Sequence, residues 1–208
     1  LFTESVNTSA LTTIFIAKFK FNGTRIYGKP YYHLSFPSFF FRGFYKHKAH
    51  FYLICYIGLT PGAPILSTGF KTTPSGGSEV VILKLDSNFN TVWSSYYGGN
   101  SIEIPLKMTF DRFDNFYISG ITRSTTGLFY RGLKNTYSGI DDIFLAKVSK
   151  NGSLLWSSYF GGNNTEQPAD MSVDIMNNLY MTGFTRSSTG ISYNGHQDTF
   201  GGLDDAFL

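Results

Sequence analysis

The hydrophobic positions of this chain fall in short runs that are separated by Asp, Asn, Gly and Ser. Short runs rich in Val, Ile, Phe and Tyr and bounded by turn-forming residues are typical of β-strands. Asp174 to Asn178 and Ser149 to Gly152 place turn residues between consecutive runs, which predicts tight hairpins. We therefore expect antiparallel strands at Ile143 to Val148, Ser153 to Tyr159, Met171 to Asp174 and Asn178 to Phe184, with a further strand from Asp205 onward.

The whole pattern returns after 63 residues. Residues 79–141 and 142–204 agree at 26 of 63 positions when they are aligned without a gap. Trp93 to Asn100, for example, returns as Trp156 to Asn163 with a single Tyr-to-Phe difference. A four-stranded sheet cannot bury both of its faces alone, so the repeat predicts sheets that stack on one another.

Composition supports a folded, all-β chain. Hydrophobic residues make up 42% and charged residues 15% of the sequence, and the 22 glycines suit short strands joined by tight turns. The single cysteine, Cys55, excludes an internal disulfide. The longest apolar run, Phe51 to Leu59, is too short to span a bilayer, so we expect no membrane span.

Charge is distributed unevenly along the chain. Residues 1–78 hold eight Lys or Arg and one Glu, whereas residues 79–208 hold nine Lys or Arg and thirteen Asp or Glu. A polyanion site in the basic segment, residues 12–78, is one interpretation, because clustered Lys and Arg attract phosphate. These residues are scattered among aromatics without a nucleic-acid motif, so we expect no nucleic-acid partner.

Four-stranded sheets can stack radially as a β-propeller or in a row as a solenoid. A repeat of 63 residues is too long for one coil of a β-helix, which favours the propeller. Asp141 to Asn163 (DDIFLAKVSKNGSLLWSSYFGGN) and Met171 to Ser188 (MSVDIMNNLYMTGFTRSS) resemble the SBBP family of bacterial β-propeller repeats. The resemblance covers residues 79–208 and implies a partial propeller, an incomplete ring of about three blades.

The repeat phase and the resemblance together imply blade boundaries. In the first third of the chain, Lys46 stands where the hairpin Asp is expected, and Lys29 to His50 lacks the Gly-Gly-Asn turn. Residues 29–58 are therefore either a divergent blade or the product of a disturbed reading frame. The expected units are 12–29 as the outer strands of a preceding blade, 41–97 as a divergent blade, 105–160 as a blade and 168–208 as a truncated blade.

Because strands alternate in direction, the loops divide between two faces. The turns at 86–90 and 111–115 lie on a short-turn face, and the long segments 122–141 and 185–204 lie on a long-loop face. Loops of this length usually form binding loops or structured caps. The positions where the repeats differ, together with the tyrosines beside them, are the candidate ligand-binding residues: Tyr130, Arg131, Lys134, Tyr193, His196 and Gln197.

Residues that recur in every repeat are more simply explained by folding than by a site. Asp141, Asp142, Asp204 and Asp205 are weak candidates for Ca²⁺ ligands, but they lack EF-hand spacing and are expected to cap turns. The recurring Arg123 and Arg186 are expected to pair with these carboxylates. Trp93 and Trp156 are expected to pack between blades rather than to stack on sugars.

The function classes follow from these motifs. No G-x-S-x-G, H-E-x-x-H or phosphate-binding glycine loop occurs, so we expect neither a catalytic residue nor a cofactor. The favoured hypothesis is a non-enzymatic segment of a secreted or cell-surface bacterial protein that binds a protein or glycan or acts as a spacer. The alternative is a propeller-type lyase or glycosidase, for which Lys107 and Asp170 are the candidates on innermost strands.

Overall fold

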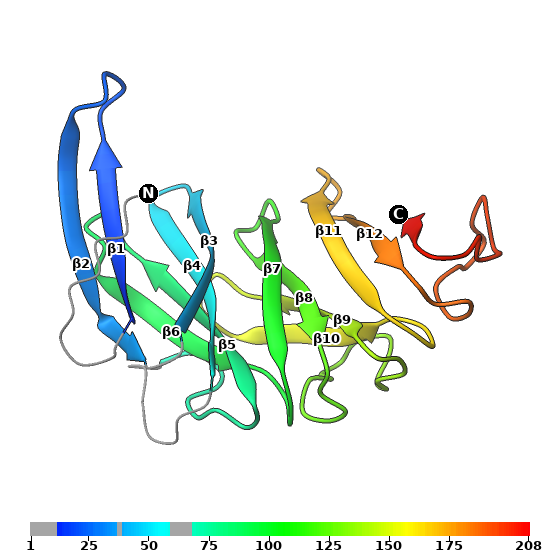
Figure 1. Cartoon of the computed structure of the whole chain (residues 1–208). Coiled ribbons are helices and arrows are strands. Elements are labelled where there is room, and N and C mark those ends of the chain that lie inside the picture. The colour runs from blue at the N-terminus through cyan, green and yellow to red at the C-terminus, as the bar shows by residue number, and fades with distance from the viewer. Residues whose placement is uncertain (1–11, 37–38, 59–67) are drawn as a thin grey trace.

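The computed structural model describes residues 12–36, 39–58 and 68–208 and is all-β. Pro37 and Ser38, within the divergent segment, lie outside the described residues. The strands form four antiparallel sheets (Figure 1). They are the N-terminal hairpin, β1 (Thr12–Phe19) and β2 (Arg25–Phe36); the first sheet, β3 (Phe39–His47), β4 (His50–Gly58), β5 (Ser78–Leu85) and β6 (Thr91–Tyr97); the second sheet, β7 (Glu103–Phe110), β8 (Phe116–Thr122), β9 (Asp142–Val148) and β10 (Leu154–Phe160); and the third sheet, β11 (Glu166–Val173), β12 (Leu179–Thr185) and β13 (Asp205–Phe207).

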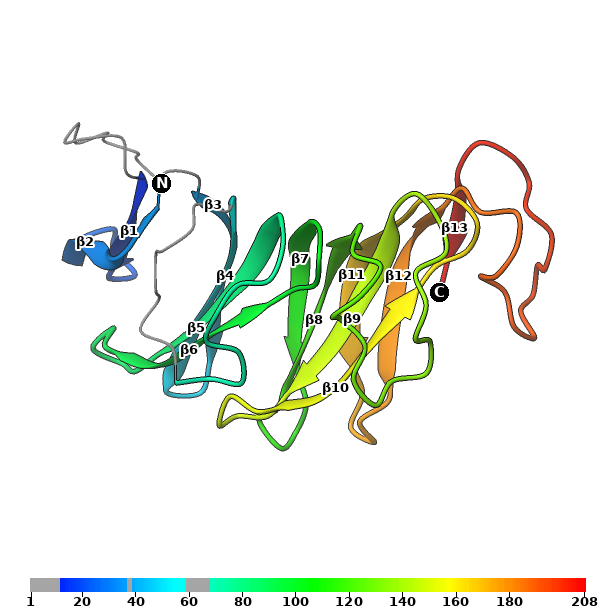
Figure 2. The same ribbon diagram turned by 90° about the horizontal axis from the view of Figure 1, so that it is seen from below.

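The sheets stand side by side in a row (Figure 2). Their first strands are neighbours, because β7 contacts both β3 and β11. The N-terminal hairpin packs through Ile16 and Tyr27 on the face of the first sheet that carries Leu53 and Val81. The all-β fold and the four-stranded antiparallel sheets expected from the repeat are confirmed. The described strands do not close into a ring.

An apolar layer joins the first and second sheets. Tyr52 and Trp93 on one side pack with Phe116 and Phe144 on the other. The ring of Trp93 stacks on that of Phe116 with centroids 6.0 Å apart, and its indole N–H donates to the carbonyl of Lys150 at 3.3 Å. The expectation that Trp93 packs between sheets is therefore confirmed.

The short hairpins are built around an Asp side chain. Asp111 accepts hydrogen bonds from the backbone N–H groups of Phe113 and Asn115, both at 2.9 Å, and from the Asn115 amide at 3.0 Å. Asp114 takes a φ of 68°, a left-handed conformation that Asp and Asn tolerate better than most residues. Asp174 makes the same three bonds in the third sheet. The predicted hairpins are confirmed.

The first sheet forms a hairpin without that Asp. Its turn, at Lys48 with a φ of 49°, instead contacts a carboxylate of the second sheet. Asp114 lies 2.9 Å from His47 Nε2 and 2.5 Å from Lys48 Nζ. The hydrogen bonds from Lys48 and His47 lower the pKa of Asp114 to about 2. A neighbouring sheet thus supplies the acidic group that this hairpin lacks.

One strand begins earlier than the hydrophobic pattern predicts. The expected strand started at Met171, but β11 starts at Glu166. The stretch Glu166 to Asp170 contains few apolar residues, so alternation alone missed it. The sheets begin at residues 39, 103 and 166, two residues before the expected units. No helix in the described part of the chain is long and apolar enough to cross a membrane.

The two equivalent hairpins provide a stability test. Asp111 also forms an ion pair with Lys147 at 3.0 Å, which Asp174 lacks. We expect Asp111→Ala to lower the free energy of unfolding by about 3 kcal/mol, because it leaves a half-buried ammonium without its partner. Asp174→Ala should lower it less, since it removes the turn bonds and one exposed hydrogen bond from the Tyr180 hydroxyl but no ion pair. Urea denaturation of both variants checks the order, and an equal or reversed order would contradict it.

Candidate functional site

A buried glutamate holds the connection between the first and second sheets. Glu103, fully buried at the start of β7, accepts a hydrogen bond from the Gly99 N–H at 2.8 Å and another from the Thr122 hydroxyl at 2.8 Å. The Thr122 hydroxyl in turn accepts the Ser124 N–H at 2.9 Å, and the Ser124 hydroxyl accepts the Ser101 N–H at 2.8 Å. This set of bonds fixes the connection at 98–103 against the start of the long loop.

The same bonds recur 63 residues later. Glu166 accepts from the Gly162 N–H at 2.8 Å and from the Thr185 hydroxyl at 2.6 Å. Ser187 then takes the place of Ser124, with its hydroxyl 2.8 Å from the Asn164 N–H. We call each set, with the lysine and second carboxylate described next, a carboxylate junction.

A lysine and a second carboxylate complete each junction. In the first, the Lys71 ammonium lies 2.9 Å from both oxygens of the fully buried Glu79 and 2.6 Å from the Gly98 carbonyl oxygen. In the second, Lys134 lies 3.4 Å from an oxygen of Asp142 and also donates to the Gly161 carbonyl. In the third repeat Gln197 stands at the position of Lys134.

The two carboxylates of a junction face the same glycine. A Cβ on Gly98 would lie 2.5 Å from an oxygen of Glu103 and 2.6 Å from one of Glu79. A Cβ on Gly161 would meet Asp142 and Glu166 in the same way, at 2.6 Å each. No side chain fits at this point, which is the physical reason for the first glycine of each Gly-Gly pair. A Cβ on the second glycine, Gly99, would lie 2.2 Å from the Thr126 carbonyl oxygen.

Burial raises the pKa of both Glu103 and Asp142, because removal from water disfavours their charged forms. The hydrogen bonds that Glu103 accepts oppose this shift, and the charge of Glu79 adds to it. Lys134 opposes the shift at Asp142, and Glu166 adds to it. A raised carboxyl pKa can mark a general acid. Here, however, the carboxylates have no exposed surface, and the same pair occurs twice.

The aspartates weighed as calcium ligands have other partners. Asp141 binds Arg123 at 2.6 Å, and Asp204 binds Arg186 at 2.5 Å, which confirms the expected pairing. Asp142 belongs to the second junction, and Asp205 accepts the Gly201 N–H at 2.6 Å. Among the described residues, no group of three His, Cys, Asp or Glu side chains could hold a metal ion.

The long loop at 123–141 covers the outer edge of the second sheet. Leu128 is buried, and Tyr130 exchanges two backbone hydrogen bonds with Ser157 of β10, at 3.1 and 2.7 Å. Lys134 continues the contact, since its carbonyl accepts the Tyr159 N–H at 3.1 Å. In the first sheet, Gly69 and Lys71 contact Ser94 and Tyr96 of β6 in the same manner. Of the two roles expected for long loops, these segments serve at least as structured caps.

The structure separates the candidate ligand-binding residues into two groups. The Lys134 ammonium is held inside the second junction. Tyr130 is 41% exposed, and the Arg131 guanidinium lies 5.2 Å from the centre of its ring. A hollow of about 320 Å³ adjoins this tyrosine and is lined by Phe70, Tyr130, Ser153 and Leu154.

The second group lies in the loop at 186–204 of the third sheet. Tyr193 is 90% exposed, and His196, three residues further along the chain, is also exposed. Gln197 is exposed too, and its amide donates to the Thr199 carbonyl at 2.8 Å. These three side chains are within reach of a ligand in solution. Whether they bind one stays a prediction.

The central residues of the junctions were not predicted from the sequence. Glu103 and Glu166 were not among the candidates, although the same Glu stands four residues after the Gly-Gly pair in both repeats. An invariant acid at the start of a buried strand was the available signal, because a carboxylate is rarely buried without partners. Glu79 could have been found through its alignment with Asp142.

Comparisons with models of known protein families and with curated proteins give no match. The resemblance to the SBBP family therefore stays a prediction carried by the motifs alone.

The raised pKa of Glu103 predicts a pH dependence. Glu103 holds its proton more tightly in the folded state than in the unfolded state. The folded protein therefore loses stability as the pH rises above 4.5, the pKa of this carboxyl in the unfolded chain. Glu103→Gln removes this titration, so the free energy of unfolding of the native chain should fall relative to that of the variant from pH 4 to pH 7. Denaturant unfolding across this range measures it.

Asp86→Asn is the matched control, because the pKa of Asp86 is shifted in the opposite direction to that of Glu103. Hydrogen bonds from Asn90 lower the pKa of Asp86, so its contribution is present at neutral pH and is lost as pH falls below 3.8. The effect of this substitution should stay constant between pH 5 and pH 7. A Glu103→Gln difference that is equally flat would contradict the assignment of a raised pKa to Glu103.

Proposed function

We propose that the chain is a run of β-propeller blades and serves as a non-enzymatic scaffold in a secreted or cell-surface bacterial protein. The contacts between the first strands of successive sheets support radial stacking. The SBBP-like motifs also support propeller blades, and they are the basis for proposing a secreted or cell-surface protein.

The repetition of the carboxylate junctions carries this proposal. A catalytic centre brings unlike groups together at one point, whereas Glu103 and Glu166 make the same bonds to the same kinds of partner. The recurring Arg and Asp residues are paired with one another in both repeats as well. The most conspicuous charged groups of the repeat thus stabilise the stack of sheets.

The groups left for recognition lie on the long-loop face of the third sheet. Tyr193 offers an exposed ring, and His196 and Gln197 offer exposed hydrogen-bonding groups in the same loop. An exposed ring in a loop that also carries polar groups suits either a sugar or a protein surface. We therefore propose this loop as the contact for a protein or glycan ligand.

Glycan and protein arrays probed with the 208-residue chain test the proposal. We expect Tyr193→Ala combined with His196→Ala to lower any bound signal at least about tenfold, because these side chains make the contact. Ile175→Ser combined with Met176→Ser is the control, since both residues are exposed in a short hairpin turn. Signal that survives the loop variant but falls with the control would contradict a site in this loop.

A further inference from the structure

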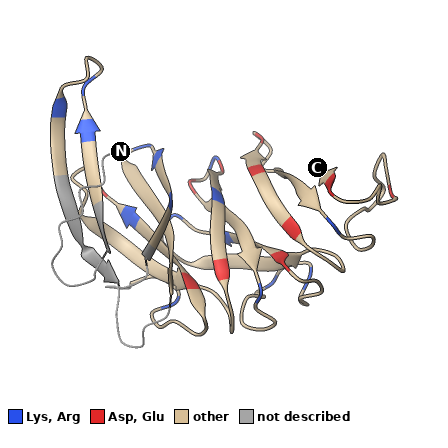
Figure 3. Cartoon of the chain, in the orientation of Figure 1, with Lys and Arg blue, Asp and Glu red and all other residues tan. Residues whose placement is uncertain are grey.

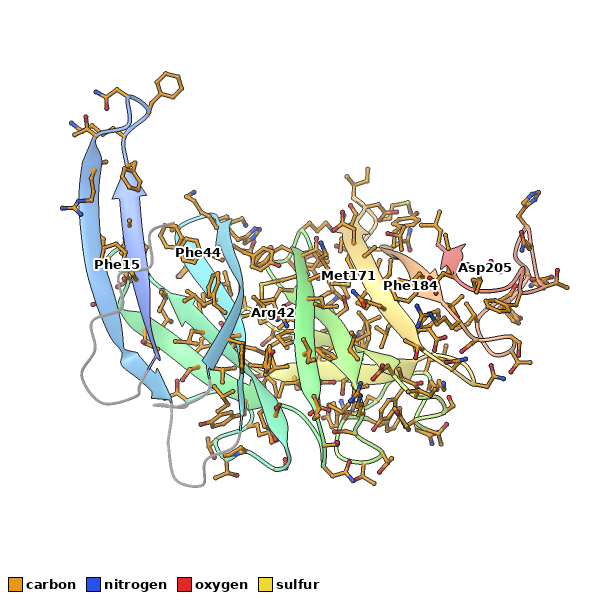
Figure 4. All side chains as sticks on the ribbon, in the orientation of Figure 1. Phe15, Arg42, Phe44, Met171, Phe184 and Asp205 are labelled. Atoms are coloured by element: carbon orange, nitrogen blue, oxygen red, sulfur yellow. The ribbon has the colours of Figure 1, made fainter. Side chains whose placement is uncertain are left out.

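The hollow beside Tyr130 lies where the first and second sheets meet. Its volume of about 320 Å³ is in the range of sites that hold small ligands, roughly 300 to 1,000 Å³. Both flanking sheets have all four of their strands, whereas Phe15 and Asp205 mark the two ends of the row (Figure 4). The hollow is therefore a feature of a contact inside the row of sheets.

Three segments of the chain meet at the hollow. Phe70 comes from the segment that contacts β6, Tyr130 from the long loop that covers β10, and Ser153 and Leu154 from the end of the β9–β10 turn. The ring of Phe70 meets that of Tyr97 edge to face, with centroids 6.4 Å apart. Because these contacts within the two sheets hold its walls, the hollow is formed before any ligand arrives.

The walls combine apolar surface with a hydroxyl group. Phe70 and Leu154 pack against the apolar layer that joins the two sheets. The side chain of Tyr130 is accessible, although its backbone is paired with Ser157. Ser153 is exposed. An aromatic ring, an aliphatic side chain and a hydroxyl in one hollow suit a sugar, which has an apolar C–H face and hydroxyl groups.

The segments around the hollow are basic (Figure 3). Residues 68–77, 124–140 and 149–155 contain Lys71, Arg131, Lys134 and Lys150 but no Asp or Glu. Lys71 and Lys134 are held in the carboxylate junctions. Arg131 and Lys150 form no ion pair within the part of the chain that the structure describes. Two cations without a carboxylate partner favour a negative charge on the ligand.

Arg131 has a backbone conformation that suits other residues better. Its φ is 54°, in the left-handed region, and Asn194 takes the same φ at the equivalent position of the next repeat. The Arg131 guanidinium lies beside one wall of the hollow, 5.2 Å from the centre of the Tyr130 ring. Arg123, in contrast, is paired with Asp141. Folding alone therefore does not explain an arginine at this position.

We propose that the hollow binds a sugar unit that carries a carboxylate, namely a uronic acid unit of a glycan. The sugar ring lies against Tyr130 and Leu154, and its hydroxyl groups bond to Ser153. Arg131 binds the carboxylate, because the planar guanidinium presents paired N–H donors that match its two oxygens. The site includes no residue of the loop at 186–204, so it is independent of the contact proposed above.

Titration calorimetry of the 208-residue chain tests the charge requirement. The probes are short oligomers of galacturonate, glucuronate and mannuronate, and the methyl esters of the same oligomers are the neutral comparison. We expect at least one acid to bind, and to bind at least about tenfold more tightly than its ester, because the ester lacks the charge that Arg131 pairs with. No binding of any acid, or equal binding of acid and ester, would overturn the proposal.

Three variants test the residues. Arg131→Asn keeps the loop backbone, since Asn194 has the same φ, and should weaken binding of the acid at least about tenfold without changing that of the ester. Tyr130→Ala should weaken binding of both, because the ring contacts the sugar itself. Tyr193→Ala, at the equivalent position of the third sheet, is the matched control and should change neither. Acid binding that survives Arg131→Asn, or that falls equally with Tyr193→Ala, would overturn the proposal.

Discussion

The arrangement of this chain depends on a carboxylate buried where one sheet passes to the next. Glu103 and Glu166 each accept a backbone N–H from a Gly-Gly pair and a hydroxyl from the strand beside them. The first glycine of each pair allows this approach, because no Cβ would fit against the paired carboxylates. A buried acid is tolerated when its lone pairs are satisfied, and here the acceptors also fix the path of the chain. Sheet order and loop position follow from that path.

The division of the molecule into a short-turn face and a long-loop face has the same origin. On the short-turn face, Asp side chains close the hairpins, and contacts such as that of Asp114 with Lys48 join neighbouring sheets. On the long-loop face, the long loops start at the junctions and run along the outer strands. Tyr130, for example, forms backbone hydrogen bonds with Ser157. The length of these loops therefore lets them cover the outer edges of the sheets, in addition to any binding role. In the third sheet the equivalent loop is exposed from Ser192 to Thr199, and for this reason we propose it as the ligand contact.

Much of this fold could be predicted from the sequence, because the 63-residue period, the hairpin Asp residues and Trp93 obey local rules of turn chemistry and burial. The Arg123–Asp141 pairing was predictable from repetition. The role of Lys134 was not, since a difference between repeats looked like surface variation, whereas the structure holds its ammonium against Asp142 and Gly161. The early start of β11 was also hidden, because its first residue is a buried Glu rather than an apolar side chain.

The paired carboxylates within one junction face the same glycine and should therefore act as a unit. A double-mutant cycle with Asp142→Asn and Glu166→Gln measures this most directly. Because each charge raises the free energy of its neighbour in a buried site, removal of one should change the effect of removing the other. We expect a coupling energy above about 0.5 kcal/mol at neutral pH. Additive effects of the two substitutions would contradict it and would show that the carboxylates stabilise their own sheets independently.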